Sequence, residues 1–306
     1  MQRIYHNIGI LAHVDAGKTT LTEQILYLTG EVRSAGSVDD GTAATDSLPI
    51  EQRRGISVRT STAYAMWNGA VINLIDTPGH VDFAGEVERS LAALDYAVVV
   101  VSAPDGVRAH TENILRALEN MNIPRLVFVN KADRAGSDTE SVLAELQETT
   151  GKPLLFLSDV KNEGRDSVSV SALSDAAFAA RATEVLAELD DEAADAFLSD
   201  EVMPHERAAD LVRRAVRECR LIPVLAGAAK LCLGVRELLC PRYPLLRSFR
   251  EAETPWGPVT VKRAEGWGVS REKPEFEDLA KIAREQNLSL RDVKEKIKTV
   301  LWHGDI

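Results

Sequence analysis

Residues 8–20 read IGILAHVDAGKTT, an apolar run that leads into a glycine, a lysine and two threonines. The run at residues 8–12 predicts a buried strand, and the residues from Lys18 onward follow a helical pattern. A loop of this spacing between a strand and a helix is typical of phosphate binding, although Ala12 stands where the usual pattern has its first glycine. Backbone N–H groups that curl around an anion, and the positive end of the helix, produce this affinity. The residues expected to bind the nucleotide here are Asp15, Ala16, Gly17, Lys18, Thr19 and Thr20.

Lys18 and Thr19 indicate how the loop would hold a nucleoside triphosphate. The Lys18 ammonium group can reach the β- and γ-phosphates, and the Thr19 hydroxyl can bind Mg²⁺. From this motif alone, a chance Gly-Lys-Thr at a helix start remains the alternative. A second phosphate motif follows the apolar run at residues 71–75. There Asp76 can hold Mg²⁺ through water, and the Gly79 N–H can meet a γ-phosphate.

Asn130, Lys131 and Asp133 follow a third apolar run, RLVFV at residues 125–129. Guanine presents an N1–H and an N2–H₂ on one edge, and the Asp133 carboxylate can accept both, whereas adenine would leave that charge unpaired. The Lys131 alkyl stem can lie over the base. After the last strand-like run, LIPVL at residues 221–225, a backbone N–H can bind the guanine O6. The residues expected at that point are Ala228, Ala229 and Lys230.

Strand-like runs and helical stretches alternate along the first part of the chain. This order predicts an α/β fold, a doubly wound and mostly parallel sheet with helices on both faces. In such sheets ligands bind beyond the carboxyl ends of the strands, which is where all four motifs lie. Four motifs in order, each after a strand, are hard to obtain by chance. The sequence therefore predicts a guanine-nucleotide site with Mg²⁺.

Composition excludes several other classes of protein. The 306 residues are 45% hydrophobic and 27% charged, as in ordinary globular proteins. The longest apolar run, residues 96–101, is far shorter than the roughly 20 residues of a membrane span. Residues 1–10 lack a signal-peptide pattern, and three cysteines are too few for a disulfide framework. The net charge of −11 argues against a nucleic-acid coat protein. We expect a cytoplasmic protein with no membrane partner and no sequence-specific nucleic-acid binding.

Over about residues 1–245 the sequence resembles the translational GTPases, and within them the tetracycline-resistance ribosomal protection proteins and elongation factor G. The stretches that carry the resemblance are AHVDAGKTTLTE (12–23), TDSLPIEQRRGIS (45–57), LIDTPGHVDFAGEVERSL (74–91), SAPDGVRAHT (102–111), VNKAD (129–133) and PVLAGAAK (223–230). Asp133 and Ala228 are 95 positions apart, which matches the inserted subdomain of elongation factor G, here at about residues 150–220, rather than the shorter loop of elongation factor Tu. The resemblance implies a P-loop GTPase domain that converts GTP to GDP and phosphate on the ribosome.

The resemblance also implies roles that spacing alone does not give. His80 would orient the attacking water, so the implied catalytic residues are His80 and Lys18. The implied metal ligands are Thr19, Ser57 and Asp76, with Ser57 where the family has a threonine. Ala228 replaces the serine of the usual Ser-Ala-Lys, and we expect somewhat weaker nucleotide affinity because the hydroxyl is lost.

Two further segments differ from this pattern. Residues 184–206 carry nine acidic residues and no lysine or arginine, which favours a solvated helical face. Residues 254–306 hold three of the four tryptophans and resemble the C-terminal region of LarC-type nickel-insertion proteins, as a small α+β tail. The β-barrel and later domains of translation factors are not in the sequence, so full translocase or resistance activity is not expected. The alternatives are a GTP-binding accessory for nickel-cofactor maturation and a truncated remnant that binds GTP.

Overall fold

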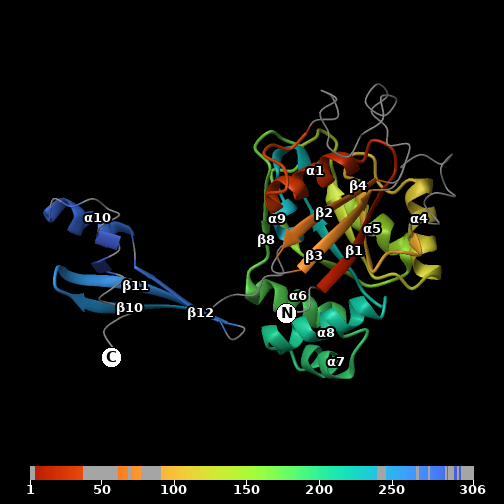
Figure 1. Ribbon diagram of the computed structural model, residues 1–306. Helices are drawn as coiled ribbons and strands as arrows, with labels where there is room; N and C mark the ends of the chain where they lie inside the picture. Colours follow the sequence, from red (N-terminus) through yellow and green to blue (C-terminus); the bar gives the residue numbers. More distant parts are fainter. Residues whose placement is uncertain are drawn as a thin grey trace. The chain divides into compact units, whose positions relative to one another are not determined.

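The computed structural model describes residues 4–36, 61–67, 70–76, 91–239, 246–266, 269–274, 276–286, 288, 293–294 and 296–297. The chain forms two compact units, Met1–Cys240 and Pro241–Ile306, coloured red to cyan and blue in Figure 1. Each unit has its own hydrophobic core. No helix among the described residues is long and apolar enough to cross a bilayer.

The first unit alternates strands and helices. The strands of its main sheet are β1 (Ile4–Ala12), β2 (Ser61–Trp67), β3 (Ala70–Asp76), β4 (Tyr96–Ser102), β5 (Arg125–Asn130), β6 (Leu154–Phe156) and β9 (Ile222–Ala226). Its helices are α1 (Lys18–Thr29), α4 (Ala109–Asn120), α5 (Thr139–Thr150), α6 (Asp175–Leu186), α7 (Asp191–Leu198), α8 (His205–Arg217) and α9 (Val235–Leu239). A small hairpin consists of β7 (Ser158–Lys161) and β8 (Ser169–Ala172).

The main sheet has seven strands in the order β2-β3-β1-β4-β5-β9-β6. Among these described strands only β2 runs antiparallel to its neighbour; the other pairs are parallel. This arrangement confirms the predicted mostly parallel α/β sheet, and the predicted strands at residues 71–75, 96–101 and 125–129 are β3, β4 and β5. The edge strand β2 is not predicted by the sequence pattern.

The central strand β4 shows why helices cover both faces. Its sequence, YAVVVVS, is almost entirely apolar, as expected for a parallel strand buried on both sides. Val99 and Val101 contact the core formed with α4 and α5, whereas Val98 and Val100 contact the core formed with α1 and α9. Figure 1 shows α4 and α5 on one side of the sheet and α1 and α9 on the other. The sheet is therefore doubly wound, as predicted.

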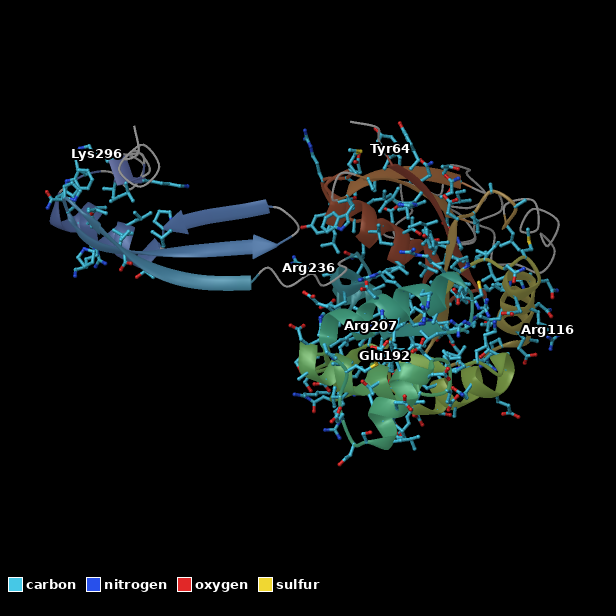
Figure 2. The ribbon with its side chains drawn as sticks, turned by 90° about the horizontal axis from the view of Figure 1, so that it is seen from below. Tyr64, Arg116, Glu192, Arg207, Arg236 and Lys296 are labelled. Atoms are coloured by element: carbon cyan, nitrogen blue, oxygen red, sulfur yellow. The ribbon has the colours of Figure 1, made fainter. Side chains whose placement is uncertain are left out.

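The insertion between β6 and β9 has a core of its own. Leu155 of the sheet edge shares this core with Leu186, Met203 and Leu211 from the insertion. The acidic stretch 184–206 ends α6, forms α7 and begins α8, and it is not only a solvated face. Arg207 Nε of α8 donates to Glu192 Oε1 at 3.1 Å, and Figure 2 shows the two residues side by side. Arg214 Nη2 donates to Asp190 Oδ2 at 2.5 Å. These ion pairs connect α8 to α7 and to the N-cap residue of α7.

The second unit is a three-stranded antiparallel sheet with a helix. Its elements are β10 (Leu246–Thr254), β11 (Gly257–Gly266), β12 (Val269–Pro274) and α10 (Phe276–Glu285). A turn joins β10 to β11, and Gly257 takes a φ of 110°, which favours glycine. Val259, Leu279 and Ile282 form a core with Val293 and Ile297.

Candidate functional site

The loop between β1 and α1 has the geometry of an anion site. Asp15 has a φ of 63° and Gly17 a φ of 94°, so the backbone turns sharply before α1 begins at Lys18. A side chain at Gly17 would place its Cβ 2.3 Å from Asn130 Nδ2, so only glycine fits. The N-cap residue of α1 is Gly17, which has no side chain to cap the helix, and the N–H groups of a first helical turn are a common phosphate site. Thr19 and Thr20 are half-buried at this end of the helix.

Lys18 reaches across to the end of β3. Its Nζ forms a buried ion pair with Asp76 Oδ1, and the two side chains are 8% and 2% exposed. Strand β3 lies next to β1 in register, with Ile10 opposite Asp76, so the two sequence motifs end at the same edge of the sheet. The predicted phosphate-binding lysine and the predicted metal-site aspartate are thus brought together.

Asn130 connects two loops that are far apart in the sequence. Its Nδ2 donates to the Ala16 carbonyl oxygen at 2.8 Å, and its Oδ1 accepts from the Ala229 N–H, also at 2.8 Å. The side chain is 3% exposed, so both bonds are shielded from water. Sequence reasoning assigned Asn130 to guanine selection and missed this connection, for which residue spacing gives no signal.

The expected base-binding residues lie at the ends of β5 and β9. Lys131 has a φ of 66°, and the Ala132 N–H donates to the Gly227 carbonyl oxygen at 3.0 Å, which holds the two loops together. Asp133 is half-buried, with its side chain 19% exposed. A short 3₁₀ turn, η2 (Ala229–Leu231), follows β9. Ala228, just before this turn, and Ala229, its first residue, are buried, whereas Lys230 is exposed.

Glycines set the shape of the loop after β9. A Cβ at Gly227 would lie 2.4 Å from the Leu233 carbonyl oxygen, and one at Gly234 would lie 2.2 Å from the Ala226 carbonyl oxygen. The Ala228 N–H donates to Leu233 O at 3.1 Å and closes the loop. The backbone donors predicted to meet guanine are therefore held in a tight, closed turn.

The oxygen donors near Lys18 suit Mg²⁺. Thr19 offers a hydroxyl and Asp76 a carboxylate, and a hard cation such as Mg²⁺ prefers oxygen ligands together with water and phosphate oxygens. The described residues contain no group of three or more His, Cys, Asp and Glu side chains that could hold a metal. The predicted residues Ser57, Gly79 and His80 lie outside the described residues.

His13 and Asp105 form a neighbouring group that sequence reasoning did not assign. His13 Nδ1 lies 3.5 Å from the Thr111 Oγ1 at the start of α4. Burial lowers the pKa of His13, and the charge of Lys131 lowers it further, although Asp105 opposes both effects. A hydrogen bond from Ser102 Oγ lowers the pKa of Asp105. The phosphate loop thus contacts the start of α4 through an imidazole that favours its neutral form.

Glu23 on α1 was also missed. Its side chain is 1% exposed, and its Oε2 accepts from the Gly36 N–H at 2.9 Å. A buried carboxylate is costly unless it is paired or hydrogen-bonded, so this contact explains part of its retention in the core. It holds the end of the described segment after α1 against the nucleotide-binding helix.

Comparison with known proteins places this site in a family. The family described as Elongation factor Tu GTP binding domain matches residues 3–245. The tetracycline resistance protein TetP of Clostridium perfringens is 36% identical over 251 residues, which cover 81% of this chain and 38% of that protein. The oxytetracycline resistance protein of Streptomyces rimosus is 44% identical over 245 residues, 76% of this chain and 37% of that protein.

Elongation factor G of Thermotoga neapolitana is 36% identical over 291 residues, 86% of this chain and 41% of that protein. Residues 1–245 alone would not fill 86% of the chain, so this likeness continues past residue 245, farther than the sequence resemblance predicted. A crystal structure of a protein from Thermus thermophilus superposes with a TM-score of 0.67 at 29% identity, over 86% of this chain and 46% of that one. The chain spans less than half the length of each of these relatives.

Proposed function

The chain belongs to the family of elongation factor Tu GTP-binding domains, and we propose that it binds GTP and hydrolyses it to GDP and phosphate as a translation-factor-like GTPase on the ribosome. We propose residues 1–245 as the GTPase domain, with its inserted subdomain at about 150–220, and the cytoplasm as its place of action. The relatives that support this reading include tetracycline resistance proteins and elongation factor G.

The observation that carries the proposal is the double hydrogen bond of Asn130. It joins the phosphate loop at Ala16 to the base loop at Ala229. A nucleotide must contact both loops at once, with its phosphates at one and its base at the other. An amide that ties the two loops together at 2.8 Å on each side sets their spacing before the nucleotide arrives, which reduces the ordering cost of binding.

At the phosphate end, Lys18 and the N–H groups at the start of α1 would neutralise the β- and γ-phosphates. Bound Mg²⁺ would supply charge neutralisation of the phosphate oxygens, held by Thr19 and Asp76 and, by the family resemblance, Ser57. In the structure Lys18 contacts Asp76 directly. A bound triphosphate would take over the ammonium group of Lys18 and leave the Asp76 carboxylate to the metal and its water.

At the base end, Asp133 would accept hydrogen bonds from the guanine N1–H and N2–H₂. The Ala229 N–H, which in the structure donates to Asn130 Oδ1, would be shared between that oxygen and the guanine O6. Replacing Asp133 by asparagine exchanges one acceptor oxygen for a donor amide and removes the charge. We expect GDP affinity to fall about 10- to 150-fold, from the roughly 1.5–3 kcal/mol of a charge-assisted hydrogen bond.

His80 would orient the water that attacks the γ-phosphate, and Gly79 would contact that phosphate. These roles rest on the family resemblance. The test is single-turnover GTP hydrolysis with purified ribosomes. His80→Ala should lose most of the ribosome-stimulated rate while binding GTP normally, and His205→Ala in the insertion, which also removes one imidazole, should retain the rate. Equal rates for His80→Ala and the unaltered protein would remove His80 from the mechanism.

Ribosome association is tested by co-sedimentation. The protein should pellet with ribosomes in the presence of a non-hydrolysable GTP analogue and remain in the supernatant with GDP. Pelleting that ignores the nucleotide, or no pelleting at all, would refute a ribosome-directed switch and favour a GTP-binding remnant. The tail keeps its own hypothesis, an accessory role in nickel-cofactor maturation, which rests on the sequence resemblance of residues 254–306. Stoichiometric, GTP-dependent nickel binding is the result that hypothesis requires, and its absence would reject it.

A further inference from the structure

The far edge of the main sheet carries a groove that the nucleotide site does not use. Strand β6 is the last strand in the sheet order on this side. A hollow of about 390 Å³ lies against it, between β6 and helix α6, and its lining includes Leu154, Phe156, Arg181, Glu184 and Glu188. This volume is within the roughly 300–1,000 Å³ of known ligand sites.

The backbone of β6 is oriented to accept another strand. The Pro153 carbonyl oxygen accepts from Ile222, and the Leu157 N–H donates to Val224, both residues of β9. Because alternate residues of a parallel strand direct their main-chain groups to the same neighbour, Leu154 and Phe156 direct theirs away from β9. Arg181 confirms this direction at one point, since its Nη1 donates to the Phe156 carbonyl oxygen at 3.1 Å. The outward N–H and C=O of Leu154 and the N–H of Phe156 therefore face the groove.

At each edge of the sheet a side chain covers part of the outward main chain. At β2 the Met66 N–H donates to Glu31 Oε1 at 3.3 Å, so a side chain covers that main-chain donor. Natural proteins commonly cover or charge their edge strands in this manner. At β6 the comparable side chain is Arg181, whose Nη1 donates to the Phe156 carbonyl oxygen at 3.1 Å and to the Ser158 carbonyl oxygen at 3.4 Å, so the main-chain groups of Leu154 lie beyond its hydrogen bonds.

The lining of the groove combines apolar residues with two acidic ones. Glu184 lies in the last turn of α6 and Glu188 in the turn that follows the helix, both side chains are exposed, and neither forms an ion pair with the residues that the structure places. Arg181 is the one cation among the described residues that line the groove, and it is already committed. It donates to Phe156 O, and its guanidinium lies 5.8 Å from the centre of the Phe156 ring. Two carboxylates are thus left to attract a cation, in a chain whose net charge is −11.

We propose that this groove binds an extended, lysine- or arginine-bearing segment of a partner protein, which adds to β6 as a further strand. Main-chain hydrogen bonds to Leu154 and Phe156 would give affinity, and a basic side chain between Glu184 and Glu188 would set the register. A three-residue strand spans about 10 Å, which limits the contact to a short segment. Nucleic acid does not fit, because its phosphates would meet the two carboxylates, and a second copy of the same edge would bring four carboxylates together.

The test uses a fluorescein-labelled hexapeptide of alternating valine and lysine as the probe, with binding followed by fluorescence anisotropy on the full chain. We expect saturable binding and slower amide hydrogen exchange over residues 154–156. The same peptide N-methylated at alternate residues should bind at least tenfold more weakly, because it cannot pair with a strand edge. Equal binding of the two peptides, or no saturable binding of either, would overturn the proposal.

Variants of the chain separate charge from strand pairing. Glu184→Lys with Glu188→Lys should weaken peptide binding at least tenfold, whereas Glu201→Lys with Glu206→Lys, the same charge change elsewhere in the insertion, should alter it less than twofold. Leu154→Pro removes one outward N–H at an edge position where proline is tolerated, and should also weaken binding. If that variant fails to fold, as judged by loss of GDP binding, the N-methylated peptide still decides the question. Equal weakening by the two double variants would reduce the effect to net charge and refute the groove.

Discussion

Replacing Asn130 by alanine should be among the most damaging single changes in the first unit. The substitution removes two hydrogen bonds of 2.8 Å from a side chain that is 3% exposed. It leaves the Ala16 carbonyl and the Ala229 N–H without this partner, and a buried polar group left unsatisfied costs about 1–3 kcal/mol. The two together predict a loss of about 2–6 kcal/mol in the free energy of unfolding. The two loops would also lose their fixed spacing, and if ordering them then costs about 1.4 kcal/mol on binding, GDP affinity should fall about tenfold.

The assay is urea denaturation without nucleotide, together with titration of a fluorescent GDP analogue. Asn130→Asp refines the measurement, since its carboxylate can still accept from Ala229 but faces the Ala16 carbonyl oxygen without a proton to donate. We expect it to be destabilised at the phosphate-loop side alone. The matched control is Asn120→Ala, at the exposed end of α4, which should change stability by no more than about 0.5 kcal/mol. If Asn130→Ala unfolds like Asn120→Ala, the two hydrogen bonds do not hold the loops together.

Three other changes test separate features of the first unit. Lys18→Met removes the ion-pair partner of the buried Asp76 carboxylate and should cost about 3–5 kcal/mol in urea denaturation. Lys18→Met with Asp76→Leu should cost less than the two single changes combined. Burial lowers the pKa of His13 in the folded state, so the unfolded chain binds that proton more readily and stability should fall as the pH drops below about 6.5. His13→Asn should flatten this part of the pH profile, and an unchanged slope would contradict the assignment. In Gly234→Ala the new Cβ would lie 2.2 Å from a backbone oxygen, so this variant should be strongly destabilised. The control is Gly151→Ala, which has a similar positive φ and open surroundings and should lose only the roughly 1 kcal/mol of left-handed strain. Similar melting temperatures for the two variants would be evidence against the close approach at Gly234.

The central strands could be predicted because burial on both faces leaves a strong signal. Val98 to Val101 are β-branched, consecutive and bounded by polar residues nearby, a pattern that few other structures produce. Strand β2 escaped prediction because only one of its faces is packed. Ala63 and Ala65 contact the core through small side chains, while Tyr64, which Figure 2 labels, is 63% exposed. An edge strand with alanines on its buried face has little hydrophobic contrast to detect.

The ligand-binding motifs were predictable, but their mutual contacts were not. Lys18, Asp76 and Asp133 stand at fixed positions after strands, and chemistry alone suggests their partners. The contacts of Asn130 join residues 114 and 99 positions away, so they depend on how the strands are ordered in the sheet. The same holds for the contact between His13 and Thr111, which requires α4 to begin beside the phosphate loop.

The parallel pairing of β6 with β9 limits how the domain can be redesigned. Leu154 lies opposite Ile222 and Phe156 opposite Val224, so residues 157–221 leave the sheet at one end of this strand pair and return at the other. A connection between parallel neighbours cannot be a tight turn and needs a dozen or more residues, usually with a helix. A shortened version of the domain must therefore keep a crossover that is long enough to bring the chain back to the start of β9.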